Sequence, residues 1–358
     1  MSDDLDLAKF ISEVTGDELL KIEENFGSGF VRLRVAEAER RQAAHDIRSS
    51  EDIIIELLRN SRDAQARNIF VASAKAQHER LFVIIDDGLG IPEDMQAKVF
   101  EPRVTSKLTS IHEDKWGIHG RGMALFSIAS NTLEHRVLRS KEKLGTSIRV
   151  LSNTLEVSEK TDQSSWPQLT KNEEGIEEFT GPKNIIRSIC EFAHDSKGAL
   201  KVYLGSPTEI AATLYAHAKS RLSAQDLLFI DSADSLKLID RLAFSSDAED
   251  FTKIANELGL EISERSAFRI LSGQISPNKH VLEVLNKRKT PKPTSLIHKD
   301  LRGLKIAPDD MKTFERDLKR SFRKLSEGYF LEDCKTPKVR ITKDKIVVTF
   351  DLSKDDSI

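Results

Sequence analysis

The chain has 358 residues, of which 32% are charged and 39% apolar, a length and balance typical of two or three globular domains with apolar cores. Lys and Arg (55) nearly balance Asp and Glu (58), which excludes a polycationic chain, and two cysteines exclude a disulfide framework. No apolar run could span a membrane and the acidic start MSDDLDLAKF lacks a secretory layout, so we expect a cytoplasmic protein with no membrane partner.

Helical and strand patterns alternate through the first part of the chain. Residues 1–50 have a charged, helical pattern, and Asp52–Ala66 has helical periodicity. The runs NIFVASA and RLFVIIDD are rich in β-branched and aromatic residues and predict two strands joined by a short turn. A short helix is predicted after Ile91-Pro92, a second one from near Gly120 through MALFSIAS, and a strand hairpin over TLEHRVLR and TSIRVLS. This alternation predicts a layered α/β domain over residues 51–152.

The rest of the chain has a different character. Residues 153–183 are polar and acidic without a clear period, which predicts a linker. Residues 184–290 are mainly helical, and residues 291–358 predict a basic helix followed by a hairpin that turns at Lys343-Asp344. From Asn286 to Lys345 there are 18 Lys or Arg and 9 Asp or Glu. This excess favours a polyanionic partner, although a solvated helix face would give the same pattern.

The first candidate motif is ELLRNSRDA, which begins with Glu56 and places Asn60 and Asp63 one and two turns later on the same helix face. An amide oxygen can bind Mg²⁺ and a carboxylate can orient a water molecule, so Glu56 and Asn60 could serve one site. The same spacing also occurs on ordinary solvated helices, so the motif alone decides nothing.

Two glycine-bearing motifs follow. In IIDDGLGIP, an aspartate at the end of a buried strand can accept a hydrogen bond from an exocyclic amine, and the glycines let backbone approach a flat ring. A tight turn is the simpler alternative. In GIHGRGMAL, three glycines precede a helix whose backbone amides can converge on phosphate oxygens. A flexible loop without a ligand fits this second motif equally well.

Taken in order, ELLRNSRDA, DDGLGIP, TSK, GIHGRGMAL and GTS resemble the ATP-binding domain shared by gyrase B, the ninety-kilodalton heat-shock chaperones, histidine kinases and MutL, the GHKL superfamily. The resemblance covers about residues 47–152, and its motifs are most similar to those of MutL and gyrase B. It implies a Bergerat-type two-layer α/β sandwich, in which a mixed, largely antiparallel sheet has helices on one face. A mainly helical C-terminal region would follow, and ATP and Mg²⁺ would be the ligands.

The resemblance also implies a role for individual residues. Glu56 matches the general base that activates water, Asn60 the magnesium ligand and Asp86 the adenine-binding aspartate. Thr146 matches the threonine that helps to hold adenine, and Lys107 of the TSK motif matches a phosphate contact. The residues implied to bind ATP are Asn60, Asp63, Asp86, Gly88, Gly90, Ile91, Thr105, Ser106, Lys107, Gly117, His119, Gly120, Arg121, Gly122, Met123 and Thr146.

The glutamate at position 56 favours hydrolysis, in which water loses a proton as it attacks. His45-Asp46-Ile47-Arg48 resembles the phosphoacceptor box of histidine kinases, but only ten residues separate His45 from Glu56, too few for the helical hairpin of such kinases. A kinase of the histidine or anti-sigma type is the alternative, and a protein that only binds nucleotide is a third. Lys171 matches poorly the phosphate-sensing lysine of gyrase-type and MutL-type enzymes. We expect ATP to close a lid over Gly117–Gly122 and so drive a conformational change or homodimerisation.

A DNA partner is suggested by the stretch from Lys253 to Pro277, which resembles a helix-turn-helix with Gly259 at its turn. Arg265 and Arg269 would then face the DNA groove from the second helix. An ordinary helical hairpin is the alternative.

Overall fold

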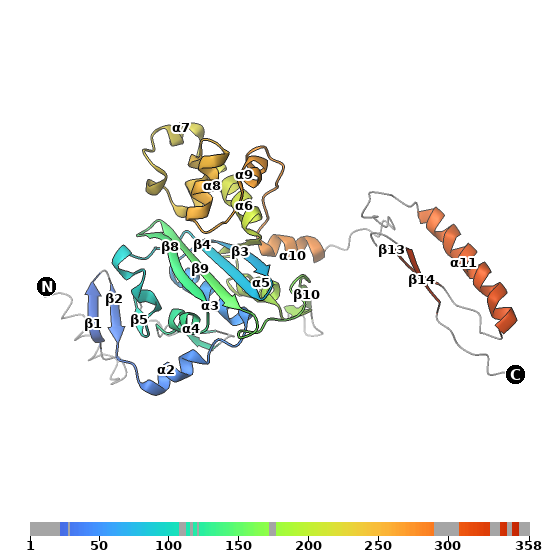
Figure 1. Cartoon of the computed structure of the whole chain (residues 1–358), viewed down its shortest axis with the longest axis horizontal. Coiled ribbons are helices and arrows are strands. Elements are labelled where there is room, and N and C mark those ends of the chain that lie inside the picture. Colours follow the sequence, from blue (N-terminus) through green and yellow to red (C-terminus); the bar gives the residue numbers. More distant parts are fainter. Residues whose placement is uncertain are drawn as a thin grey trace. The chain divides into compact units, whose positions relative to one another are not determined.

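The computed structural model of the chain describes residues 22–27, 29–106, 112–114, 117–119, 122–171, 177–289, 308–329, 337–341 and 346–350. The chain divides into two compact units, Met1–Lys289 and Thr290–Ile358 (Figure 1). The second unit begins next to the boundary that the sequence predicts after residue 290. Each unit is described by itself below.

The first unit is built on a five-stranded sheet. Its strand order is β12-β3-β4-β9-β8, with β12 parallel to β3 and every other neighbouring pair antiparallel. The mixed, largely antiparallel sheet that the sequence predicts is therefore confirmed. The strands are β3 (Asn68–Ala76), β4 (Glu79–Asp86), β8 (Glu134–Lys141), β9 (Gly145–Asn153) and β12 (Lys201–Gly205).

One face of the sheet carries the helix that positions the candidate site. This helix, α3 (Ser50–Asp63), begins at a capping box in which the Ser49 hydroxyl accepts a bond from the Asp52 amide and the Asp52 carboxylate accepts one from the Ser49 amide. Its apolar residues pack against the same-face side chains of β3, β4 and β9. Other helices in this layer are α4 (Ala124–Ser130), α5 (Ile185–Asp195) and α10 (Val281–Lys289).

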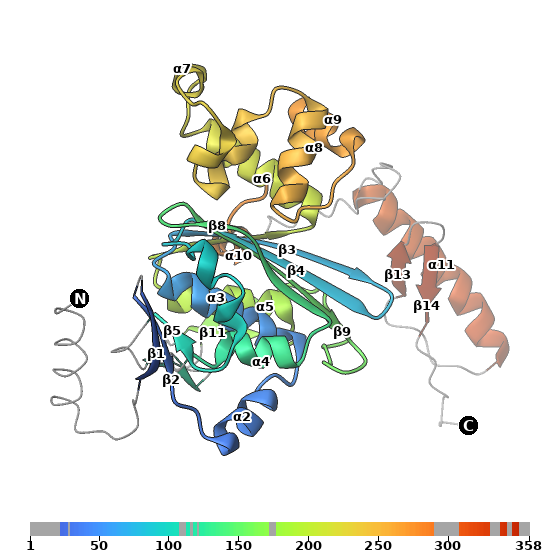
Figure 2. The same cartoon turned by 60° about the vertical axis from the view of Figure 1, so that its left-hand side comes forward.

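The opposite face of the sheet is also covered by helices, whereas the resemblance implies helices on one face (Figure 2). Phe70, Val83 and Ile85 of β3 and β4 are buried on this side. Because β4 carries apolar residues at consecutive positions, both of its faces need covering. The covering elements are α6 (Pro207–Lys219), the 3₁₀ helix η4 (Leu238–Phe244), α8 (Ala248–Glu257) and α9 (Glu264–Leu271), with α7 (Ala224–Leu228) and η3 (Ala233–Ser235) beside them in the chain.

The segment predicted as a linker, 153–183, is part of the first unit. It contains a hairpin of β10 (Gln168–Lys171) and β11 (Glu177–Thr180). The Asn184 side-chain amide donates hydrogen bonds to the carbonyl oxygens of Asp162 and Ser165, at 2.9 and 2.8 Å, which fixes this segment to the start of α5. Because β12 follows it and still joins the sheet, the sheet extends across the predicted boundary.

The N-terminal segment differs from the helix predicted over residues 1–50. Within its described part, β1 (Ile22–Gly27) and β2 (Phe30–Leu33) form a hairpin that pairs with β5 (Val104–Thr105). Gly27 and Gly29 take φ angles of +77° and +80° at the turn, which other residues adopt only at a cost. Helix α2 (Glu37–Ala44) follows the hairpin. The short helix predicted after Ile91-Pro92 corresponds to the 3₁₀ helix η1 (Glu93–Met95). The remaining short elements are η2 (Lys98–Phe100), β6 (His112–Asp114) and β7 (Gly117–His119).

The second unit has one long helix and one hairpin, as the sequence predicts. Helix α11 (Pro308–Tyr329) precedes β13 (Lys338–Ile341) and β14 (Ile346–Thr349), which pair antiparallel. Phe322 of α11 is buried and stacks on Phe350, with ring centroids 4.5 Å apart. The predicted turn at Lys343-Asp344 lies outside the described residues. No helix in the described part of the chain combines the length and apolar character of a membrane span.

Candidate functional site

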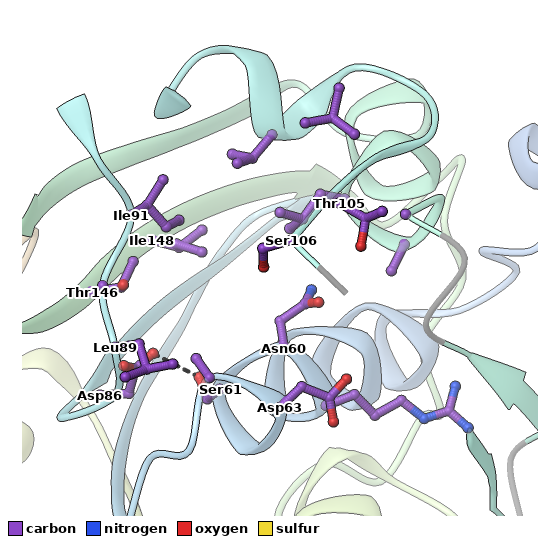
Figure 3. A pocket seen from close by; sticks show the side chains of 18 of the residues that line it. Asn60, Ser61, Asp63, Asp86, Leu89, Ile91, Thr105, Ser106, Thr146 and Ile148 are labelled. Carbon is purple, nitrogen blue, oxygen red and sulfur yellow. Dashed lines mark hydrogen bonds between the residues drawn. The ribbon is translucent and has the colours of Figure 1, made fainter. Parts of the chain in front are cut away.

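A cavity of about 510 Å³ opens between α3, the ends of β4 and β9, and the chain on either side of the segment 107–121 (Figure 3). This volume lies in the range of small-molecule sites. Ten of the predicted site residues line the cavity, and they are Glu56, Asn60, Asp63, Asp86, Gly90, Ile91, Thr105, Ser106, Gly122 and Thr146.

The other predicted site residues lie elsewhere or are not described. Gly88 and Met123 do not line the cavity; Met123 is the residue before α4. Gly117 and His119 are the ends of β7, whose side chains are not described. Lys107, Gly120 and Arg121 fall outside the described residues. Of the predicted lid, Gly117–Gly122, the structure therefore describes residues 117–119 and 122.

Asp86 is the most constrained carboxylate of the cavity. Its side chain is buried, Oδ2 accepts a 2.8 Å hydrogen bond from the Ser61 hydroxyl, and Oδ1 accepts a 2.9 Å bond from the Gly88 amide. Burial raises the pKa of Asp86 from 3.8 to about 6, although these hydrogen bonds and one from the Thr146 amide oppose the rise. The neighbouring Asp87 has different hydrogen-bond partners, because its Oδ1 accepts bonds from the backbone amides of Arg67 and Asn68 at 2.7 and 2.8 Å.

Ser61 was not identified from the sequence as a site residue. The available signal was its position directly after Asn60 in the last turn of α3, because a buried hydroxyl group usually has a specific hydrogen-bond partner. The apolar lining residues were also missed, apart from Ile91; they are Phe30, Ala64, Leu89, Val99, Val104, Ala124, Leu125 and Ile148.

Thr146 lies opposite Asp86 in the pairing of β4 with β9. Its hydroxyl lies 3.1 Å from the Ser140 hydroxyl of β8, and the Ser140 oxygen accepts a 2.7 Å bond from the Ile91 amide. The two strand ends and the loop that carries Ile91 are therefore held together by hydroxyl groups. This end of the cavity presents the Asp86 carboxylate and the hydroxyl groups of Ser61 and Thr146 among apolar side chains (Figure 3).

The glycine at position 90 is required by the protein's own packing. Its φ is +76°, and a Cβ there would lie 2.0 Å from the carbonyl oxygen of Lys141. The Lys143 amide in the same turn donates a 2.6 Å bond to the Leu89 carbonyl. The turn after β4 is therefore closely packed against the hairpin that joins β8 and β9.

Helix α3 supplies the polar side chains at the other end of the cavity. Glu56 forms an ion pair with Arg59, whose side chain is only 4% exposed. The Asn60 side chain projects from α3 towards Ser106 and Thr105 (Figure 3). Its Nδ2 is buried with no hydrogen-bond partner among the described residues. A buried polar group of this kind is expected to have a partner, so the amide suits a ligand in the cavity.

The chain before residue 107 is joined both to the N-terminal hairpin and to Gly122, the last residue of the predicted lid. Val31 of β2 pairs with Thr105, and the Leu33 amide donates a 3.0 Å bond to the Arg103 carbonyl. The Arg103 amide in turn donates a 2.9 Å bond to the carbonyl of Gly122. Gly29 and Phe30 of the hairpin also line the cavity, which the sequence analysis did not anticipate.

His45, Arg265 and Arg269 do not line the cavity. His45 is exposed at the C-terminal cap of α2. Arg265 and Arg269 are exposed on α9, in the layer on the opposite face of the sheet. Lys171 ends β10, and its side chain is not described.

Part of the first unit is similar in sequence to known proteins. Residues 47–184 match a family described as histidine kinase-, DNA gyrase B-, and HSP90-like ATPase. The DNA mismatch repair protein MutL of Clostridium beijerinckii is 46% identical over 81 residues, which are 22% of this chain and 12% of that protein. MutL of Clostridium perfringens is 38% identical over 102 residues, 27% of this chain and 15% of that protein. The chain thus spans less than a sixth of the length of these relatives. Residues 47–184 are therefore a GHKL-type ATPase domain with partial homology to MutL.

Proposed function

We propose that this protein binds ATP in the cavity, with the adenine amine bonded to Asp86, and hydrolyses it with Mg²⁺. The observation that supports this best is the buried carboxylate of Asp86 in the cavity wall, which accepts hydrogen bonds from the Ser61 hydroxyl and from the Gly88 and Thr146 amides. An ionised carboxylate has about four lone-pair sites. It can therefore take a further bond from an exocyclic amine, which also offsets the cost of its burial.

The purine ring lies between apolar side chains in this proposal. Leu89, Ile91 and Ile148 line the cavity near Asp86, and the Thr146 hydroxyl supplies a second polar group. The triphosphate then extends along α3 towards Asn60, under the segment that begins after Ser106. Gly117, Gly120 and Gly122 would cover the phosphates and Lys107 would contact them, as the resemblance implies.

Glu56 and Asn60 divide the chemistry between them. Mg²⁺ would be held by the Asn60 side-chain oxygen and the phosphates, where it neutralises charge on the phosphoryl group. As the water oxygen bonds to the γ-phosphorus and the bond to ADP breaks, Glu56 accepts the proton of the water. The Arg59 guanidinium fixes the direction of the Glu56 carboxylate through their ion pair.

Lid closure would be transmitted through the N-terminal hairpin. Strand β5 lies directly before the covering segment and is paired with β2, so a shift of Thr105 on ATP binding moves Val31 with it. This coupling is the proposed route by which ATP changes the conformation of the chain or its self-association.

A single-turnover assay tests the proposed hydrolysis. Glu56→Ala should keep ATP binding and lose phosphate release by at least two orders of magnitude, because general-base catalysis contributes this much. Asp86→Asn should lose binding itself. Phosphate release by Glu56→Ala at the parental rate would contradict the role of Glu56.

The competing kinase function predicts a different product. After incubation with γ-labelled ATP, a kinase would carry acid-labile phosphate on His45, and the His45→Gln variant would carry none. This result would favour phosphotransfer over hydrolysis. The exposed position of His45, outside the cavity lining, gives this alternative no geometric support within the chain.

A further inference from the structure

Three polar residues lie side by side on neighbouring strands at one end of the cavity. Ser140 of β8 pairs with Thr146 of β9, and Thr146 pairs with Asp86 of β4. Side chains that are directly opposite each other on antiparallel strands project from the same face of the sheet. Asp86 and Thr146 line the cavity (Figure 3), whereas Ser140 does not. Ser140 can therefore influence a ligand there through its contact with Thr146.

The Ser140 hydroxyl oxygen makes three polar contacts. It accepts a 2.7 Å hydrogen bond from the Ile91 amide, and it lies 3.1 Å from the Gly145 carbonyl oxygen and 3.1 Å from the Thr146 hydroxyl oxygen. A hydroxyl group has one proton and two acceptor lone pairs. Because a carbonyl oxygen can only accept, the contact with Gly145 uses the proton of Ser140. All three contacts are hydrogen bonds only when Thr146 donates its own proton to Ser140.

This direction of the bond determines what Thr146 offers to the cavity. With its proton turned towards Ser140, the Thr146 oxygen has only lone pairs left for a ligand. Thr146 can donate to a ligand only if Ser140 turns its own proton away from Gly145, and one hydrogen bond is then lost. The Ser61 hydroxyl and the Gly88 amide direct their protons to Asp86. These groups therefore offer acceptors to the cavity, and a ligand has to supply the protons.

We propose that Ser140 is a positioning residue that makes the cavity select purines with an exocyclic amine, because it holds the Thr146 hydroxyl as a hydrogen-bond acceptor. This inference rests on the proposed function, in which the adenine amine bonds to Asp86. It adds a residue that does not touch the nucleotide and a reason for the choice between purines.

The amine of adenine matches two neighbouring acceptors. It has two hydrogens, and Thr146 can accept the one that Asp86 does not take. Opposite residues on antiparallel strands have Cβ atoms about 5 Å apart, and two acceptors about 2.9 Å from one amine nitrogen are separated by about 5 Å. A purine without the amine presents the acceptor N1 at this edge instead. It can gain a bond from Thr146 only at the expense of the bond between Ser140 and Gly145.

Calorimetry with two nucleosides at pH 7.5 tests this inference. Adenosine and purine riboside differ only in the amine, and the ratio of their affinities is the amine preference. In Ser140→Ala this ratio should fall about 3- to 10-fold, the value of one neutral hydrogen bond, because Thr146 can then turn its proton to N1. Thr146→Val should lower the ratio as well. Adding Ser140→Ala to Thr146→Val should change it no further, because Ser140 acts through Thr146.

Two control variants separate this effect from a loosened loop. Ser140 also holds the Ile91 amide, so its removal frees part of the turn after β4. Gln96 holds the same turn, since its Nε2 donates to the carbonyl oxygens of Ser140 and Ile91 at 3.1 and 3.4 Å. Gln96→Leu should weaken both nucleosides by one common factor and leave the amine preference unchanged. Ser140→Thr keeps the hydroxyl group and should retain the preference of the parent.

Three results would overturn the inference while leaving adenine at Asp86. They are a parental amine preference in Ser140→Ala, a further fall when Ser140→Ala is added to Thr146→Val, and an equal fall in Gln96→Leu. In each case Asp86→Asn should still lose adenosine, which upholds the proposed function. A parent that binds neither nucleoside, or both equally, would overturn the proposed position of adenine and this inference with it.

Discussion

The Ser61 hydroxyl donates a 2.8 Å hydrogen bond to Oδ2 of Asp86, and this contact joins helix α3 to the end of strand β4. It places the acceptor proposed for adenine next to the helix turn that carries Asn60. Because both residues are buried, the bond lies out of bulk solvent. The distance between the two ends of the proposed ATP site is therefore fixed by the protein before any nucleotide binds.

Asp86→Asn should stabilise the nucleotide-free protein while abolishing nucleotide binding. Burial raises the folded-state pKa of Asp86 from 3.8 to about 6, so the folded form holds this proton more tightly than the unfolded form. The free energy of unfolding therefore falls as pH rises from about 4 to 6, by about 3 kcal/mol at most. At pH 7.5 the variant should be more stable by about 1 to 3 kcal/mol, with the gain disappearing towards pH 4.

Urea denaturation at several pH values measures this effect. Asp87→Asn is the matched control and should bring no gain in stability at pH 7.5, because Asp87 is only partly buried, whereas Asp86 is buried. Equal or lower stability of Asp86→Asn at pH 7.5 would contradict the raised pKa.

Adenosine binding should depend on the ionisation of Asp86. The carboxylate is ionised above its pKa of about 6 and can then accept the amine proton; below this pH it carries a proton of its own. Affinity should be constant above pH 7 and fall up to tenfold per pH unit below 6. Calorimetry with adenosine, which has no titrating phosphate, measures this. An affinity independent of pH between 5 and 8 would exclude Asp86 as the acceptor.

Ser61→Ala should raise the midpoint pH of adenosine binding. The Ser61 hydrogen bond lowers the pKa of Asp86, so its removal raises the pKa further, and adenosine should begin to dissociate at a higher pH. Ser127→Ala is a suitable control, because its buried hydroxyl donates to the carbonyl of Met123, the residue before α4, and not to Asp86. A midpoint shared by Ser61→Ala and the parent would show that the hydrogen bond has no influence on the site.

The local motifs predicted much of this site because each is carried by one element. Glu56 and Asn60 share a face of α3, and Asp86 ends β4. Spacing along one helix or strand is a property of the backbone and can be read directly from the sequence. The same reasoning predicted the antiparallel strands on either side of short turns.

Contacts between distant segments were beyond such reasoning. The pairing of Val31 with Thr105 joins residues more than seventy positions apart, and nothing in either local pattern specifies the partner. The second helical layer was a different case, since the consecutive apolar residues of β4 already required cover on both faces. The domain boundary placed at 153–183 concealed this, because it separated β12 and α6 from the sheet they complete.

Arg59→Met should lower kcat with little change in KM. The ion pair with Arg59 holds the Glu56 carboxylate, and a general base that samples other orientations takes the proton of water less often. We expect a loss of about 10- to 100-fold in steady-state phosphate release, with Arg59→Lys retaining part of the rate. Thermal unfolding measured alongside separates this from instability, since Arg59 is buried. A rise in KM without a change in kcat would instead place Arg59 in nucleotide binding.

Gly145→Ala should disrupt the strand end that holds Asp86. Gly145 has a φ of +97°, and a Cβ there would lie 2.0 Å from the carbonyl oxygen of Asp86. The backbone of Asp86 could move away from this Cβ only if the pairing of β4 with β9 were broken. Gly198 shares the strain but not the clash, because its φ is +79° and a Cβ would meet nothing within 4 Å. Gly198→Ala should therefore cost about 1 to 2 kcal/mol, whereas Gly145→Ala should cost more than about 4 kcal/mol and weaken adenosine binding. Urea denaturation of the two variants measures the difference. If the two variants lost equal free energy of unfolding, backbone strain alone would explain the glycine at position 145, and its close approach to Asp86 would not.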